Sequence, residues 1–254
     1  MSISSLVCTS SDTASWLSLF CSTSDTGVTY VELFTGAVEW TLLVSLYAWL
    51  IAMVIGVLVG IGLTSKSTWI RTICILYTEV FRNIPLLVQL FLWYYVIPHI
   101  LPGPLGRFFT SFTYPYDAML SAVLCLGLFT SVRIAIQLSS GIRSLPRGQS
   151  MAATALGLKR TQMYRYVLLP VAFRIILPPT ISEMLNLLKN SSVASVIGLI
   201  EITGAATSMA ESTFQIFPAY IAATVLYIVI NLFILFVMSR VERWVQIPGF
   251  VTSK

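Results

Sequence analysis

The chain has 254 residues and a formal net charge of +5, and 57% of its residues are hydrophobic whereas only 10% are charged. Soluble domains typically carry about 25% charged residues, so this composition excludes an ordinary soluble domain. No constellation of catalytic side chains and no metal-binding cysteine spacing occurs, which argues against an enzyme and a metal site. The excess of Lys and Arg requires no nucleic-acid partner, because topology and lipid headgroups account for it. The sequence therefore predicts an all-α integral membrane protein.

Residues 1–36 precede the first long hydrophobic run and are predicted to form an extracytoplasmic N-terminal tail. This segment contains no Lys or Arg and no short apolar region followed by a small-residue cleavage site, so it does not resemble a cleavable signal peptide. Cys8 and Cys21 both lie in the tail and can pair if it faces an oxidising compartment. The sequence leaves open whether they do.

Five hydrophobic runs long enough to cross a bilayer follow the tail. They cover residues 40–63, 70–100, 118–142, 178–200 and 217–238, within a predicted membrane domain of residues 37–245. The second run is too long for one straight crossing and contains Pro85 and Pro98, which predicts a kinked helix. Residues 246–254 are expected to form a C-terminal tail.

Basic residues concentrate on alternate connections between these runs. One side has Lys66, Arg71, Arg143, Arg147, Lys159, Arg160, Arg165, Arg174, Arg240, Arg243 and Lys254, and the opposite side has only Arg107. Cytoplasmic loops of membrane proteins carry the excess of Lys and Arg. We therefore expect the N-terminus outside, the C-terminus in the cytoplasm, and a long cytoplasmic loop over residues 143–174.

This long loop contains good helix formers at 152, 153, 155 and 156, followed by Gly157, which predicts a short helix that ends or bends at the glycine. From the residues alone, the segment is either a basic membrane-surface loop without a partner or a docking site for another protein. Its spacing, with Ala152-Ala153, then Gly157, then Val167-Leu168-Leu169-Pro170, resembles the EAA loop of ABC importer permeases. Met151 stands where that family usually has Glu, and Val167 replaces its Ile.

Other segments extend the resemblance over nearly the whole chain beyond the tail. Residues 79–89 (EVFRNIPLLVQ), 145–149 (LPRGQ) and 186–192 (NLLKNSS) resemble stretches of the polar amino acid permeases. Within that family, Arg82-Asn83, Arg133 and residues 164–170 are most similar to the glutamate/aspartate type. One departure is that Ile136 and Ser139 stand where family members often carry Glu and Arg.

The resemblance implies a type I ABC importer permease fold with five transmembrane helices in the bacterial cytoplasmic membrane. The implied function is import of an amino acid, with glutamate or aspartate favoured and another polar amino acid, basic or neutral, as the alternative. A different class would be an ATP-independent secondary transporter, but the matching halves typical of that class are not evident.

The resemblance also implies partners. A cytosolic ATPase dimer would dock on the loop through Gly148, Gln149, Ala152, Ala153, Gly157, Leu169 and Pro170. The chain has no Gly-x4-Gly-Lys-Ser/Thr motif, so ATP is expected on the ATPase and no cofactor on this chain. The other implied partners are a second permease subunit (a similar paralogue or a second copy), an extracytoplasmic amino acid-binding protein and membrane lipid.

Polar side chains recur along two predicted spans. Thr130, Arg133, Gln137 and Ser140 share one helical face of the third run, and Ser182, Asn186, Lys189 and Ser192 recur similarly along the fourth. A charge at membrane depth costs about 2.5–3.5 kcal/mol on insertion scales, so each cation there is expected to have a functional or structural role. Either these residues line a hydrated path, where Arg133 and Lys189 compensate an anionic substrate, or the cations belong to structural ion pairs. Arg82 is a further path candidate that can instead pair with Glu79.

Overall fold

The computed structural model describes residues 18–24 and 27–245. Cys8, most of the predicted N-terminal tail and the predicted C-terminal tail lie outside these residues, and so does the possible pairing of Cys8 with Cys21. Within the described part of the chain, regular structure is helical apart from one isolated bridge between Thr23 and Thr29. The all-α prediction is therefore confirmed.

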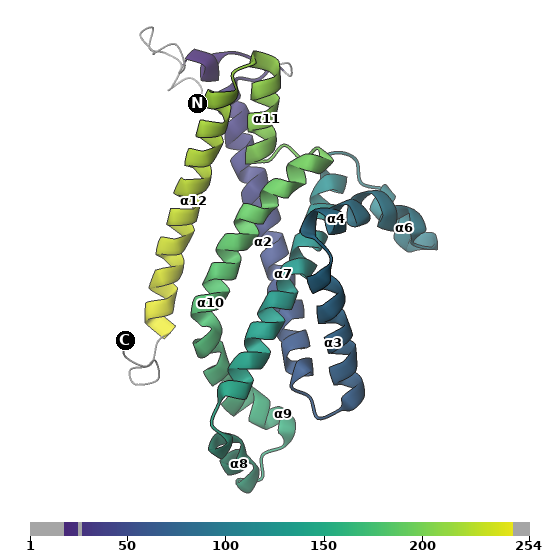
Figure 1. Ribbon diagram of the computed structural model, residues 1–254, viewed down its shortest axis with the longest axis vertical. Coiled ribbons are helices and arrows are strands. Elements are labelled where there is room, and N and C mark those ends of the chain that lie inside the picture. The colour runs from purple at the N-terminus through teal and green to yellow at the C-terminus, as the bar shows by residue number, and fades with distance from the viewer. Residues whose placement is uncertain (1–17, 25–26, 246–254) are drawn as a thin grey trace. The chain divides into compact units, whose positions relative to one another are not determined.

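Four long helices dominate the chain (Figure 1). They are α2 (Tyr30–Leu63), α7 (Tyr116–Ser144), α10 (Leu169–Asn190) and α12 (Ile216–Val245). The stretches that are long and apolar enough to cross a bilayer are Tyr30–Leu63, Tyr116–Ser144, Arg160–Ile197 and Ile216–Trp244, and a bent helix pair adds a fifth if it counts as one span. The structure thus supports four or five crossings.

Shorter elements precede or connect the long helices. They are η1 (Ser18–Cys21), α3 (Thr68–Asn83), α4 (Leu86–Phe91), the π-helical turn η2 (Leu92–Val96), α5 (Ile97–Ile100), α6 (Gly103–Thr110), α8 (Arg147–Ala155), α9 (Arg160–Met163), the π-helical turn η3 (Tyr164–Leu168), the 3-10 helix η4 (Ser191–Ile197) and α11 (Ile202–Thr213).

The predicted kink in the second hydrophobic run is a sharp corner. Helix α3 ends at Asn83, and the stretches on either side of the break differ in direction by 103°. Ile84 has extended backbone dihedrals, as expected for a residue directly before a proline. The buried Gln89 amide secures the corner, because its Nε2 donates to Phe81 O at 2.7 Å and Ile84 O at 2.9 Å. The other proline, Pro98, lies in α5, which continues directly from η2, and it makes no break in the stretch Leu86–Ile100.

The helix that contains the start of the fourth hydrophobic run begins before the run does. Helix α10 begins at Leu169 and contains both Pro178 and Pro179. A proline inside a membrane helix is tolerated because neighbouring groups satisfy the backbone atoms it leaves free. At the other end the helical segment stops at Gly198, whose φ of +89° is left-handed.

The chain folds into two compact units whose boundaries fall inside long helices. The first comprises Met1–Tyr47, Leu90–Val123 and Leu188–Leu232, and the second comprises Ala48–Gln89, Leu124–Leu187 and Phe233–Lys254. In the first unit, one buried cluster joins the start of α2, helix α11 and the start of α12. Small residues such as Ala205, Ala219 and Ala223 in this cluster let the helices approach closely.

In the second unit, α2 packs tightly on α7 through two glycines. A Cβ added at Gly56 would lie 2.8 Å from Ile134 Cβ, and one added at Gly60 would lie 3.0 Å from the carbonyl oxygen of Ala135. Two glycines four residues apart present a flat strip that permits close helix approach in a membrane. A second cluster, comprising Leu138, Ile142, Leu145, Leu168, Ala172 and Ile176, joins the end of α7 to η3 and the start of α10.

Candidate functional site

Helix α8 forms the short helix predicted in the long loop, and it ends at Ala155, two residues before Gly157. Gly157 has a φ of +75°, Leu158 N donates to Ala153 O at 3.1 Å, and Gly157 N donates to Thr154 O at 3.0 Å. These two bonds form a Schellman motif, which requires a left-handed residue at the helix end. No atom lies within 4 Å of the position that a Cβ of Gly157 would occupy. Backbone conformation therefore explains the glycine within this chain.

The outer surface of α8 is apolar. Ala153 is buried against the protein, whereas Ala152 and Ala155 are exposed, and Met151 and Leu156 are 65% and 80% exposed. None of these residues lies in a candidate membrane span. An exposed apolar strip on a helix outside the spans is typical of a contact surface for another protein.

The remaining predicted coupling residues fall into two groups. Gly148 and Pro170 are exposed, whereas Leu169 packs against the apolar cluster at the end of α7. The Oε1 atom of Gln149 is buried without a hydrogen-bond partner among the described residues. The structure thus places Gly148, Ala152, Gly157 and Pro170 on the surface, and their role in docking stays a prediction.

Arg133 and Gln137 of α7 both meet a carboxylate of α10. Arg133 Nη1 lies 3.3 Å from Glu183 Oε2, and Gln137 Nε2 donates to Glu183 Oε1 at 3.4 Å. Thr180 Oγ1 extends the network to Gln137 Oε1 at 3.5 Å. The Arg133 side chain remains 43% exposed. The structure therefore provides the ion pair that was one of the two explanations for Arg133, while leaving the guanidinium accessible.

Glu183 is a functional candidate that the sequence interpretation missed. Its neighbour Ser182 was assigned to the polar face of this helix, but Ser182 is exposed and the polar contacts with α7 come from Thr180 and Glu183. The available signal was that Glu183 is the single acidic residue in the hydrophobic run 178–200. An acid at membrane depth indicates a partner of opposite charge.

Asn186, Lys189 and Ser192 follow Glu183 along the same helical segment. Asn186 is half-buried, Lys189 is exposed, and Ser192 Oγ donates to the Lys189 backbone oxygen at 2.8 Å. Lys189 forms no ion pair with any residue that the structure describes. Lys189 and Ser192 belong to the first unit, whereas Asn186 belongs to the second with Arg133 and Gln137.

Arg82 lies at the end of α3 and pairs with Glu79. The distance between Arg82 Nη1 and Glu79 Oε1 is 3.9 Å, and both side chains are more than half exposed. The Asn83 amide also donates to Glu79 Oε2 at 3.1 Å. An exposed pair of this kind contributes little stability, about 0–1 kcal/mol.

A second buried acid, Glu201, was also missed. It is 1% exposed, caps the start of α11 by accepting from Gly204 N at 2.9 Å, and accepts from the Tyr227 hydroxyl at 2.6 Å. Burial raises the pKa of the Glu201 carboxyl, and the hydrogen bonds from Tyr227 and the backbone oppose part of that rise. Ile202 N donates to Thr41 Oγ1 at 3.2 Å. These contacts attach α11 to both α2 and α12.

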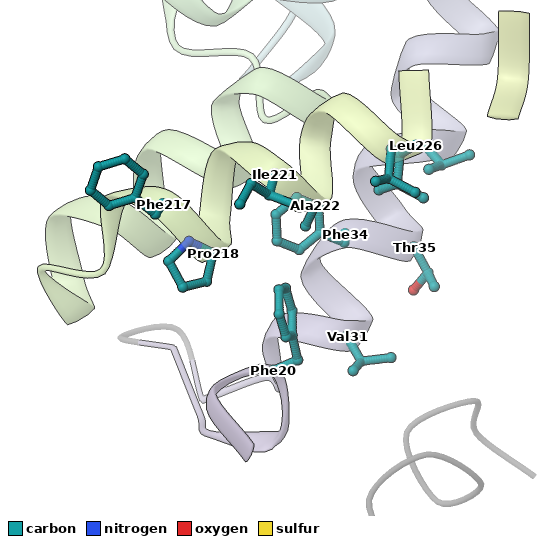
Figure 2. Close-up of a pocket in the computed structure, with 11 residues that line it drawn as sticks. Phe20, Val31, Phe34, Thr35, Phe217, Pro218, Ile221, Ala222 and Leu226 are labelled. Atoms are coloured by element: carbon teal, nitrogen blue, oxygen red, sulfur yellow. The ribbon is translucent and has the colours of Figure 1, made fainter. Parts of the chain in front are cut away.

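A cavity of about 760 Å³ in the first unit lies between the starts of α2 and α12. Figure 2 shows Phe20, Phe34 and Phe217 among its lining side chains, and Thr35 supplies the single hydroxyl among the lining residues. Such a surface offers no partner to a charged or zwitterionic solute. We therefore assign the cavity no part in binding a polar substrate.

Several bilayer-length helices, a polar network between two of them and a short helix with an exposed apolar strip outside the spans are typical of a multi-pass membrane transport protein. Residues 52–247 match the family of binding-protein-dependent transport system inner membrane components, and the chain belongs to this family. It is therefore an inner membrane transport component and not an enzyme. The family resemblance noted in the sequence is confirmed.

Similar proteins agree with this assignment. The chain is 44% identical over 227 residues to the glutamate/aspartate import permease protein GltJ of Escherichia coli, covering 89% of this chain and 92% of the relative. It is 33% identical over 216 residues to the nopaline transport system permease protein NocM of Agrobacterium fabrum, covering 83% and 86%. The crystal structure of an amino acid ABC transporter with histidines matches with a TM-score of 0.73 and 29% identity, covering 91% of this chain and 99% of that one.

Proposed function

We propose that the chain is the permease subunit of an ATP-driven importer for amino acids and that glutamate and aspartate are its substrates. The similarity to the E. coli glutamate/aspartate permease extends over nearly the full length of both chains, which supports this substrate class. In the proposed orientation the N-terminus lies outside and the C-terminus in the cytoplasm, following the distribution of Lys and Arg.

The observation that carries the proposed mechanism is the exposed apolar strip of α8. Met151 and Leu156 are too exposed for packing residues of this chain, and an ATPase subunit in the cytoplasm would bury them. ATP is bound and hydrolysed by that partner, because this chain has no phosphate-binding motif. A second permease subunit completes the translocation path, and an extracytoplasmic binding protein delivers the amino acid.

The charges along α10 support an anionic substrate. Glu183 already balances Arg133, so that pair adds no net charge to the membrane-embedded region. Lys189 is exposed and forms no ion pair within the described residues, so it supplies an unbalanced cation. A cation of this kind at membrane depth is stabilised by an anion that passes beside it.

A substitution at the end of α8 tests the coupling mechanism. Asp and Asn both tolerate the left-handed conformation of Gly157 better than other side chains do, so Gly157→Asp and Gly157→Asn differ chiefly in charge. We expect Gly157→Asp to abolish ATP-driven uptake while the protein still inserts, because a carboxylate desolvated at the contact costs about 1–3 kcal/mol or more. Gly157→Asn should retain uptake. Normal uptake by the Asp variant would exclude α8 from coupling.

Neutralising Lys189 tests the substrate assignment. In vesicles containing the complete transporter, Lys189→Met should lower the ratio of glutamate to glutamine uptake, normalised to assembled complex. The matched control is the double variant Arg133→Gln with Glu183→Gln, which removes an ion pair without changing net charge and should affect both substrates alike. An unchanged ratio in Lys189→Met would place the selection elsewhere, in the external binding protein.

Another polar amino acid is the second candidate substrate. The nopaline permease relative is 33% identical, so the same fold serves a different compound in that protein. Uptake and ATPase stimulation measured with a panel of acidic, basic and neutral amino acids separate the two assignments. Stimulation by basic or neutral amino acids alone would overturn the glutamate/aspartate assignment.

A further inference from the structure

The C-terminal end of α2 is held by side chains from distant parts of the second unit. The helix ends at Leu63, and the last carbonyl groups of a helix have no partner in the helix itself. Arg143, in the last turn of α7, donates from Nη2 to the Leu63 oxygen at 3.0 Å. A cation at a helix C-terminus also interacts favourably with the helix dipole.

Two further donors come from the segment that follows α8. Arg160 Nη2 donates to the Thr64 backbone oxygen at 3.3 Å, and the Tyr164 hydroxyl donates to the same oxygen at 3.1 Å. The Tyr164 hydroxyl also lies 3.0 Å from Thr64 Oγ1. The Arg160 guanidinium lies 5.7 Å from the Tyr164 ring centroid, so the two side chains support each other. We name the contacts of Arg160 and Tyr164 with Thr64 the α2 clamp.

Apolar packing joins the same segments. Met163 and Tyr164 pack against the cluster that contains Leu138 and Ile142 of α7, and Ile61 of α2 packs against that cluster too. Tyr164 begins the π-helical turn η3, and such turns occur frequently at functional sites. The ends of α2 and α7 and the α9–η3 segment therefore form one packed body.

The connection between α8 and the clamp is short. Helix α8 ends at Ala155, and α9 begins at Arg160, where the Lys159 backbone N–H is capped by Gln162 Oε1 at 2.8 Å. Helix α8 also packs against α9 and η3, the elements that carry Arg160 and Tyr164. A displacement of α8 that carries these elements with it would therefore either move the end of α2 or break the clamp.

We infer that Arg160 and Tyr164 are positioning residues that transmit movement of α8 to the first membrane helix. This inference rests on the proposed coupling through α8. The clamp joins the segment on which α8 packs to α2, which is far from α8 in sequence. Loss of the clamp should leave ATP hydrolysis in place and reduce the transport obtained from it.

The test compares Tyr164→Phe and Arg160→Gln with Tyr166→Phe and Arg165→Gln in the reconstituted complete transporter. Arg165 and Tyr166 contact each other and form no hydrogen bond with α2 in the described structure, so these controls remove the same groups at neighbouring positions. The readout is glutamate transported per ATP hydrolysed. We expect each clamp variant to lower this ratio about two- to tenfold, the equivalent of one hydrogen bond, and the controls to leave it unchanged.

The outcomes separate this inference from the proposed function. A purely structural role would lower assembly, uptake and ATPase activity together and leave the ratio unchanged, which would overturn the inference. Arg160→Lys keeps a donor and should restore part of the ratio. If Gly157→Asp abolishes uptake while both clamp variants keep the wild-type ratio of glutamate transported to ATP hydrolysed, the inference about the clamp is wrong and the proposed docking of α8 is unaffected. If Gly157→Asp transports normally, the proposed coupling itself fails.

Discussion

Two buried or half-buried acids each hold contacts between helices. Glu183 neutralises Arg133 between α7 and α10, and Glu201 holds α11 through hydrogen bonds without a cation among the described residues. Glu183 has a cationic partner, whereas burial makes ionisation of Glu201 costly. The pH dependence of stability therefore tests the environment of Glu201.

For Glu201 we predict a stability that depends on pH. Its pKa is raised above the ordinary value of 4.5 in the folded protein, so the folded state binds more protons than the unfolded chain does. Stability is then fully present below about pH 4.5 and falls as the pH rises through the folded pKa. Glu201→Gln should abolish this decline and leave the thermal unfolding midpoint at neutral pH equal or higher.

The matched control is Glu211→Gln, because Glu211 is an exposed acid in the same helix α11. The thermal unfolding midpoint of the Glu211→Gln variant should depend on pH as that of the wild type does. Thermal unfolding of the purified protein between pH 4 and pH 8 provides the measurement, and a Glu201→Gln variant that keeps the wild-type decline would contradict the assignment.

At the scale of elements, the glycines of α2 have different roles along one helix. Gly56 and Gly60 face α7 at distances that leave no room for a side chain, whereas Gly36 has no atom within 4 Å of its Cβ position. The length of α2 follows from its apolar composition, but its tight packing on α7 depends on the absence of side chains at two positions.

We therefore predict opposite effects of the same substitution at two sites in α2. Gly56→Ala should destabilise the protein by about 1–3 kcal/mol, because the new Cβ would meet Ile134 and the backbone oxygen of Ser131. Gly36→Ala should stabilise it by up to about 1 kcal/mol, because alanine is the better helix former. Thermal unfolding in detergent measures both, and equal effects at the two positions would show that the α2–α7 contact is looser than described.

At the scale of the whole molecule, the apolar helices and the basic loops together predict one orientation in the membrane. Lys and Arg stand on alternate connections, which predicts that α8 and the C-terminus lie on the cytoplasmic side. This orientation is required for α8 to meet a cytosolic ATPase.

Cysteine labelling tests the orientation. In a variant with the native cysteines replaced by serine, cysteines introduced at Ser150 and Lys254 should react only with a reagent present in the cytoplasm. A cysteine at Gly103 should react from outside, in the loop on the side with little positive charge. Labelling of position 150 from outside in sealed cells would reverse the orientation and remove the basis for coupling through α8.

The sequence by itself determined the class of the protein, the approximate position of most apolar helices, a proline kink in the second hydrophobic run and a short helix that ends close to Gly157. These features depend on local properties: the length of an apolar run, the missing N–H of a proline, and the freedom of a glycine to adopt a positive φ. Only the tertiary structure decided that Glu183 meets Arg133, that Glu201 meets Tyr227, and that Arg160 and Tyr164 hold Thr64. These partners lie 26 to 100 positions apart and come together only when helices pack, and a single sequence contains no local signal for which faces of its helices will meet.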